Sequence, residues 1–214
     1  MSEGALLAYY ADRADTYDDI YEIPEVQADY DRLESAFRER FAGRNVLEIA
    51  CGTGYWTQVI ADVADSILGV DANREPIREA RTRTYPQSTP VRFVLGDAYR
   101  LPVTGGFSAG FAGFWWSHVP RQRRTGFLRA FHAALEPGAV VCLFDNRLVE
   151  GFVEPDTTDE RGNTYQFRDD AGDGEYRVLK NFPTEDELTG LVSNFGSDVE
   201  YRELEHFWCL SYRV

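Results

Sequence analysis

The chain has 214 residues, of which 43% are hydrophobic and 27% charged, and this size and composition suit one compact domain rather than two. Its 22 Lys and Arg face 36 Asp and Glu, a formal net charge of −14, which disfavours nucleic-acid binding through a broad basic face. The three widely spaced Cys predict neither a disulfide framework nor a paired-cysteine zinc site, and a reducing, cytoplasmic setting is expected.

The N-terminal residues 1–42 are expected to be helical. Residues 1–10 contain only a short apolar patch after Glu3, which is not the pattern of a signal peptide, and no apolar run reaches membrane-spanning length. Pro24 suits the first turn of a helix, and apolar side chains then recur at steps of three or four from Val26 to Phe41. Gly43 is a natural stop, so a helix over these residues is predicted.

Residues 43–147 alternate between short apolar runs and segments of helical spacing. The runs cover residues 46–50, 67–70, 91–95, 109–114 and 139–144. This alternation predicts an α/β, Rossmann-like, doubly wound domain with a mostly parallel sheet. In the last helical segment, apolar residues from Phe127 to Leu135 predict a helix that ends at Pro137 and Gly138.

Residues 148–214 predict an antiparallel elaboration of the same domain. Segments 164–168 and 175–179 alternate in hydropathy around the turn-forming residues 171–174, a pattern typical of a hairpin. Thr184 and Glu187 form a capping-box pattern ahead of one more helix, and strands are expected near 199–204 and 207–212. We therefore expect residues 1–214 to form a single domain.

The chemistry-bearing residues begin in the loop after the first strand. Gly52 and Gly54 allow a ligand to approach the backbone, and the following helix points free N–H groups at that space. A nucleotide-like cofactor is the expected occupant, with a plain structural turn as the alternative. The next strand ends at Asp71, where doubly wound folds bind ribose hydroxyls, and the third strand ends at Asp97.

In this order and spacing, residues 9–146 resemble the class I S-adenosylmethionine-dependent methyltransferases. Glu48, Gly52 and Gly54 match the family motif around the methionine part and ribose of the cofactor. Asp71 matches the acidic residue on the ribose, and Asp97 with Ala98 matches the pair at the adenine. The resemblance implies a seven-stranded sheet, an N-terminal helical lid and S-adenosyl-L-methionine as cofactor. The residues expected at the cofactor are Tyr17, Glu48, Ala50, Gly52, Gly54, Asp71, Ala72, Asp97, Ala98 and Phe114.

Two departures bear on the cofactor. Ala50 stands where the family often has its first glycine, which is expected to tighten the loop without abolishing binding. NAD is the alternative cofactor, but Thr57 occupies the third glycine position of its fingerprint and Glu48 then has no role. An acidic, aromatic pocket also suits the sulfonium cation better than a pyrophosphate.

The acceptor side is predicted from the family resemblance and from the residues that follow the fourth and fifth strands. The resemblance implies that the N-terminal helix covers the cofactor, with Tyr10 and Tyr17 as lid residues, and a plain surface helix is the alternative. His118 is a candidate base, with a helix-capping role as the alternative. The residues expected to line the acceptor pocket are Tyr10, Trp115, Trp116, Asn146 and Arg147.

The predicted reaction is methyl transfer by direct displacement to an O, N, S or C atom of a small molecule, without a metal ion. An NAD-linked oxidoreductase and a non-catalytic S-adenosylmethionine-binding protein are the alternatives. No partner other than the small-molecule acceptor is expected, neither nucleic acid nor membrane. The oligomeric state is left open, with a homodimer among the possibilities.

Overall fold

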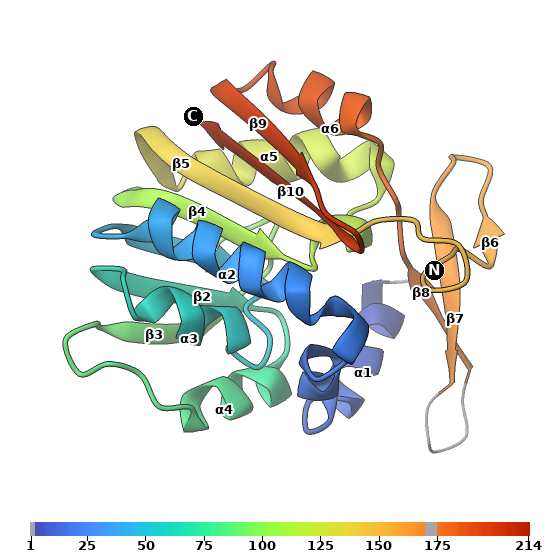
Figure 1. Ribbon diagram of the computed structural model, residues 1–214, viewed down its shortest axis with the longest axis horizontal. Coiled ribbons are helices and arrows are strands. Elements are labelled where there is room, and N and C mark those ends of the chain that lie inside the picture. The colour runs from blue at the N-terminus through green and yellow to red at the C-terminus, as the bar shows by residue number, and fades with distance from the viewer. Residues whose placement is uncertain (1–2, 170–174) are drawn as a thin grey trace.

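The computed structural model describes residues 3–169 and 175–214 (Figure 1). The N-terminal part contains α1 (Glu3–Asp12), the short 3-10 helices η1 (Tyr17–Tyr21) and η2 (Pro24–Val26), and α2 (Gln27–Phe41). The next elements are β1 (Asn45–Ile49), α3 (Tyr55–Ala61), β2 (Ser66–Asp71), α4 (Arg74–Thr82), β3 (Val91–Leu95), β4 (Phe107–Gly113), η3 (Trp116–His118), η4 (Arg121–Arg123), α5 (Arg124–His132) and β5 (Leu135–Asn146). The C-terminal part contains β6 (Thr157–Thr158), β7 (Thr164–Asp169), β8 (Glu175–Leu179), α6 (Glu185–Val192), β9 (Ser197–Glu203) and β10 (Phe207–Arg213).

The main sheet has seven strands in the order β3-β2-β1-β4-β5-β10-β9, so the predicted seven-stranded, mostly parallel α/β fold is confirmed. Strands β1 to β5 pair in parallel, and β10 pairs antiparallel with both β5 and β9. The strand order reverses between β1 and β4, because the chain moves outward from β1 to β3 and then crosses back to place β4 on the other side of β1. In open α/β sheets, ligands bind beyond the carboxyl ends of the strands at such a reversal.

Helices cover both faces of the sheet, with α2 and α3 in front and α5 behind in Figure 1. The two faces follow from the strand period of two, because Val46 of β1 enters one core cluster and its neighbour Leu47 enters the other. Phe37 and Phe41 of α2 are fully buried in the first cluster, and Phe127 of α5 is fully buried in the second. These cores fix the strand ends that carry the candidate site.

A three-stranded antiparallel sheet, β6-β7-β8, stands beside the main sheet (Figure 1). The predicted hairpin is confirmed in β7 and β8, which pair from Tyr165 with Leu179 to Asp169 with Glu175. The expected turn residues 171–174 lie outside the described residues. Thr184 caps α6 by accepting a hydrogen bond from the Glu187 N–H, as the capping pattern predicted. Within the described residues, no helix is both long and apolar enough to cross a bilayer.

The prediction that helical structure continues to Leu135 and stops at Pro137 and Gly138 is wrong. Helix α5 ends at His132, and Leu135 is already the first residue of β5. Gly138 has φ +82 and lies within this strand, where the pairing with β4 changes register. The apolar spacing of three and four crosses a helix-to-strand junction, because Leu135 packs in the same core cluster as Phe127.

Candidate functional site

The loop that joins β1 to α3 holds three residues with positive φ, namely Ala50 (54°), Gly52 (54°) and Gly54 (79°). At Gly52, an added Cβ would meet no atom within 4 Å, so the backbone there faces open space. At Gly54, an added Cβ would lie 2.7 Å from the Tyr85 hydroxyl and 3.2 Å from the Cα of Ala80. The two glycines therefore have different functions, since one exposes backbone to a cavity and the other lets the loop pack on α4.

The first cavity has a volume of about 340 Å³ and lies at the carboxyl ends of β1, β2, β3 and β4. It is closed on one side by Leu6 and Leu7 of α1. Eight of the ten residues expected at the cofactor line it: Tyr17, Ala50, Gly52, Asp71, Ala72, Asp97, Ala98 and Phe114. Three residues expected at the acceptor also line it: Tyr10, Trp115 and His118.

Asp71 and Asp97 are the two carboxylates in this lining. Asp71 accepts hydrogen bonds from the Gly52 N–H at 2.9 Å and the Asn73 N–H at 2.8 Å, one on each oxygen. Burial raises the pKa of Asp71 above its ordinary value, and these backbone donors oppose the shift. Asp97 accepts from the Tyr99 N–H at 2.8 Å. The lining contains no Lys or Arg, so the first cavity favours a cation over a phosphate.

Glu48 and Gly54 do not line the first cavity. The Glu48 side chain is buried below the loop, where it accepts a hydrogen bond from the Thr57 hydroxyl at 2.6 Å. Burial raises the pKa of Glu48 to about 8, and the nearby Asp71 adds to the shift, so the Glu48 carboxyl is neutral at pH 7. Glu48 thus supports the loop from beneath and does not touch the cavity.

A second cavity of about 270 Å³ lies next to the first. Four residues line both cavities and separate them: Tyr10, Tyr17, Phe114 and His118. Its remaining lining comes from α1 and the turn after it, from η1, η2 and α2, from the end of β5 and the loop after it, and from the hairpin and β10. A molecule in the second cavity therefore lies beside one in the first, with aromatic side chains at the boundary.

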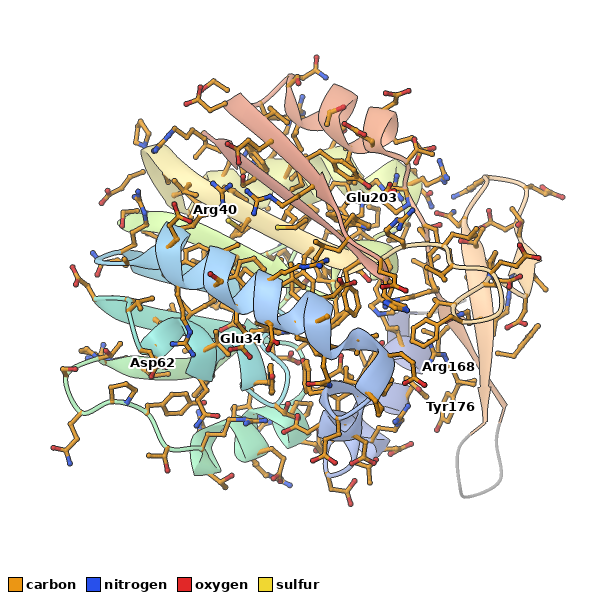
Figure 2. The ribbon with its side chains drawn as sticks, in the orientation of Figure 1. Glu34, Arg40, Asp62, Arg168, Tyr176 and Glu203 are labelled. Carbon is orange, nitrogen blue, oxygen red and sulfur yellow. The ribbon has the colours of Figure 1, made fainter. Side chains whose placement is uncertain are left out.

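The charge of the second cavity is opposite to that of the first. Arg13, Arg168 and Lys180 line it, and within the described part of the chain no Asp or Glu does. Arg168 comes from β7 and Arg13 from the turn after α1. Figure 2 shows Arg168 between the hairpin and the N-terminal helices. The hairpin is held there by Tyr176, which pairs with Arg168 in register and donates a hydrogen bond to Asp12 at 2.8 Å.

Lys180 is the centre of a buried polar network behind the second cavity. Its Nζ lies 3.0 Å from Ser117 Oγ, 3.0 Å from Asp145 Oδ1 and 2.7 Å from Asn146 Oδ1. Burial alone would raise the pKa of Asp145, but the Lys180 charge and the Ser117 and Asn146 N–H donors hold it below its ordinary value. Asp145 is therefore ionised, and its charge offsets that of Lys180.

His118 lies at the boundary between the cavities with both ring nitrogens occupied. Its Nδ1 is 2.6 Å from the Leu179 carbonyl oxygen, so Nδ1 carries the proton and Nε2 accepts from the Tyr10 hydroxyl at 2.8 Å. Burial, assisted by the Lys180 charge, lowers the pKa of His118 to about 3. The imidazole is neutral at pH 7 and is a weak base.

The other residues expected at the acceptor are dispersed. Asn146 lines the second cavity. Trp116 lies outside both cavities, 1% exposed and packed against Phe127. The Arg147 guanidinium points away, donates to the Leu204 carbonyl oxygen at 2.6 Å and forms an ion pair with Glu203. Among the described residues, no three His, Cys, Asp or Glu side chains are grouped to hold a metal ion.

Sequence reasoning did not identify Arg13 or Arg168 as site residues. Arg13 lies in the Tyr-rich segment before η1, and Arg168 lies at the end of a β7 strand whose alternation indicated only a hairpin. Their common location depends on how the hairpin docks on the N-terminal helices, and no local pattern encodes that. Lys180 lies in the polar pair Lys180-Asn181 after β8, which the sequence alone assigns neither to a pocket nor to packing.

Comparison with known proteins identifies methyltransferases as relatives of this chain. The pattern of the family described as "Methyltransferase domain" matches residues 46–138. A demethylmenaquinone methyltransferase from Bacillus licheniformis is 32% identical over 108 residues, which cover 47% of this chain and 44% of the relative. A probable S-adenosylmethionine-dependent methyltransferase from Mycolicibacterium smegmatis is 46% identical over 64 residues, which cover 30% of this chain and 23% of the relative. The chain thus spans less than half the length of these curated relatives.

Solved structures match over the whole fold. The structure described as "DhpI-SAM-HEP complex" is 26% identical, covers 100% of both chains and has a TM-score of 0.82. PH0226 from Pyrococcus horikoshii OT3 is 20% identical with a TM-score of 0.75, and the match covers 96% of this chain and 98% of PH0226. At this identity, the match supports a common fold and nothing more. Together, the matched family pattern, the relatives and the solved structures support a class I S-adenosylmethionine-dependent methyltransferase.

Proposed function

We propose that this chain is a methyltransferase that binds S-adenosylmethionine in the first cavity and a small-molecule acceptor in the second. The observation that carries the proposal is the pair of adjoining cavities, which share Tyr10, Tyr17, Phe114 and His118 as their boundary. Direct displacement needs donor and acceptor side by side, and alignment with exclusion of water contributes most of the rate enhancement.

Four features of the first cavity fit this cofactor. The open space above Gly52 admits a ligand against the backbone. Asp71 presents a carboxylate to the cavity at the position where such folds bind ribose hydroxyls. The absence of Lys and Arg from the lining suits a sulfonium cation and leaves the pyrophosphate of NAD without a counter-charge. The volume of about 340 Å³ lies within the usual range for small-molecule sites.

In this proposal, each residue holds one part of the cofactor. Asp71 binds the ribose, Asp97 and Ala98 border the adenine, and the loop at Gly52 borders the methionine part. Tyr17 borders the methyl-bearing sulfur beside the second cavity. When bound, the cofactor supplies an electrophilic methyl group. The chain orients the two partners and excludes water, since α1 and η1 cover the cavity.

The relatives support a small-molecule acceptor. Proteins that match over about half of this chain are named for demethylmenaquinone and for ubiquinone biosynthesis, and one related structure is a complex of DhpI with SAM and HEP. We extend the small-molecule class to this chain and assign no metal ion to the reaction, because the described residues group no metal-ligating side chains. The three buried free thiols agree with a reducing, cytoplasmic setting.

The first test is calorimetry with S-adenosylmethionine, S-adenosylhomocysteine and NAD. We expect the first two to bind and NAD not to bind. Asp71→Asn removes the charge from the proposed ribose acceptor, so its affinity for S-adenosylmethionine should fall about 10- to 100-fold, the range for charge-assisted hydrogen bonds. Asp65→Asn is the matched control. It removes the same charge at the residue that precedes β2, whereas Asp71 is the last residue of that strand.

Unchanged affinity in Asp71→Asn, or binding of NAD alone, would remove the assignment of the first cavity. Catalysis is tested separately by the release of S-adenosylhomocysteine with a panel of phenols, amines, thiols and carboxylic acids. Tight cofactor binding with no turnover on any of these would favour the non-catalytic alternative.

A further inference from the structure

The second cavity collects positive charge in a strongly acidic protein. Three of the 22 Lys and Arg line it, and no Asp or Glu that the structure describes does. A random sample of this chain's charged residues would place more carboxylates than cations there. The cavity is also apolar elsewhere, with Ile20, Ile23 and Val26 in its wall, so its cations are poorly screened.

Lys180 does not supply the free charge. A protonated lysine has three donors, and Ser117, Asp145 and Asn146 occupy all three. The Lys180–Asp145 pair is almost fully buried and close to neutral as a unit, with side chains 5% and 0% exposed. It positions Asn146 and the end of β5, and the uncompensated charge of the cavity comes from the two arginines.

Arg13 and Arg168 keep most of their donors available. Arg13 donates to the Tyr9 hydroxyl at 2.7 Å, and Arg168 donates to the side-chain oxygen of Gln166 at 2.5 Å. Both of these partners are neutral, and no carboxylate whose side chain the structure describes forms an ion pair with either arginine. Each guanidinium has five donors in a planar fork, a geometry that matches two oxygens of one oxyanion.

The boundary between the cavities lacks an effective base. His118 is a weak base with both nitrogens engaged. Burial raises the pKa of both Tyr10 and Tyr17 well above its ordinary value, so both hydroxyls stay protonated. An alcohol or ammonium acceptor would have to give up a proton, and this boundary offers no effective base to take it. An acceptor that is already ionised in neutral solution has no such need.

We propose that Arg13 and Arg168 hold the oxyanion of a small acid, a carboxylate or a phosphate ester, and that an oxygen of this group accepts the methyl. This inference rests on the proposed function. The acceptor oxygen uses a lone pair to form the new bond to the methyl carbon, and the carbon–sulfur bond breaks with its electron pair remaining on sulfur. The sulfonium becomes a neutral thioether, the oxyanion loses one negative charge, and no proton moves.

The test uses protein saturated with S-adenosylhomocysteine and four probes in calorimetry. Methyl phosphate and propionate are the tetrahedral and planar anions, and trimethyl phosphate and propionamide are their uncharged counterparts. We expect at least one anion to bind at least tenfold more tightly than its uncharged counterpart. The anion that binds identifies which of the two oxyanion shapes the cavity takes.

Arg168→Gln is expected to weaken binding of that anion by about 10- to 100-fold, because it removes the guanidinium that donates charge-assisted hydrogen bonds to the anion. Arg177→Gln is the matched control and should change the affinity less than twofold. Arg177 lies on the neighbouring strand of the same hairpin and stacks on Tyr165, 3.7 Å from its ring centroid, outside both cavities. Arg13→Gln removes the second arginine from a different element and should weaken binding in the same way.

The outcomes separate this inference from the proposed function. Cofactor affinity should be unchanged in Arg168→Gln, because Arg168 lines only the second cavity, and this also verifies folding. Anions that bind no better than their uncharged counterparts, or full anion affinity in both arginine variants, would overturn the oxyanion acceptor while leaving cofactor binding intact. Loss of cofactor binding in the unmodified chain would overturn the proposed function instead.

Discussion

At the scale of single residues, Gly52 and Gly54 differ in what surrounds them. Both have positive φ, so a side chain at either position costs about 1–2 kcal/mol of backbone strain. Only Gly54 is also packed, against Tyr85 and Ala80. The open side of Gly52 belongs to the first cavity.

We therefore expect Gly52→Ala and Gly54→Ala to affect different properties. Gly52→Ala should lower the free energy of unfolding by only about 1–2 kcal/mol and weaken S-adenosylmethionine binding at least tenfold, since the methyl group enters the cavity. Gly54→Ala should lower the free energy of unfolding by about 2–5 kcal/mol, because overpacking adds to the strain. Urea unfolding and calorimetry measure the two quantities, and equal losses of stability in both variants would contradict this division.

Glu48 gives a prediction about pH. Its folded pKa of about 8 is above the ordinary value of 4.5, so the folded state keeps a proton that the unfolded chain releases between these values. The contribution of Glu48 to stability is therefore present at low pH and declines as pH rises through this window, by up to about 1.4 kcal/mol per pH unit.

Glu48→Gln is uncharged at every pH and keeps an oxygen for the Thr57 hydroxyl. The free energy of unfolding of Glu48→Gln, relative to the unmodified chain, should rise by roughly 2–4 kcal/mol between pH 5 and pH 8. Urea unfolding at pH 5, 6, 7 and 8 measures this difference. A difference that is constant across the series would show that Glu48 is ionised in the folded state.

At the scale of elements, the N-terminal segment, residues 3–26, closes over the first cavity through a few polar contacts. Asn73 donates to the Leu7 carbonyl oxygen at 2.9 Å, and Asp18 accepts from the Thr53 hydroxyl at 2.5 Å and pairs with Arg83. Leu6 and Leu7 line the cavity itself, so a bound cofactor adds contacts to this segment.

We expect saturating S-adenosylhomocysteine to slow tryptic cleavage after Arg13 by at least about tenfold, because cleavage requires the segment to open and binding stabilises the closed form. Cleavage after Arg161 is the internal control, since Arg161 is exposed in the turn before β7 and lines neither cavity. Limited proteolysis followed by mass spectrometry resolves the two sites. Equal protection at both would indicate global stabilisation rather than closure of this segment.

Element type was predictable wherever burial alone dictates the pattern. The central strands β1, β4 and β5 follow continuous apolar runs because helices cover both of their faces, and α6 follows its capping residues. The prediction failed at Leu135, where a helix and a strand join within one apolar stretch. The two-residue strand β6 was missed, because Thr157 and Thr158 lie in an acidic, turn-rich stretch.

At the scale of the whole molecule, the sequence predicted the first cavity better than the second. The residues of the first cavity lie at the ends of consecutive strands, so their order along the chain already brings Asp71, Asp97 and Gly52 together. The second cavity joins residues from opposite ends of the chain, such as Arg13 and Arg168. Their proximity is a product of tertiary docking, which a residue pattern does not record.

The opposite charges of the two cavities have a consequence for turnover. An acid held by Arg13 and Arg168 loses one negative charge when it becomes an ester, so the electrostatic attraction that retained it weakens in the same step. Affinity for the ester should then be lower than affinity for the acid, without any movement of the protein. In the proposed reaction, product release is therefore coupled to the chemistry, and we expect accumulated ester to inhibit the next cycle only weakly.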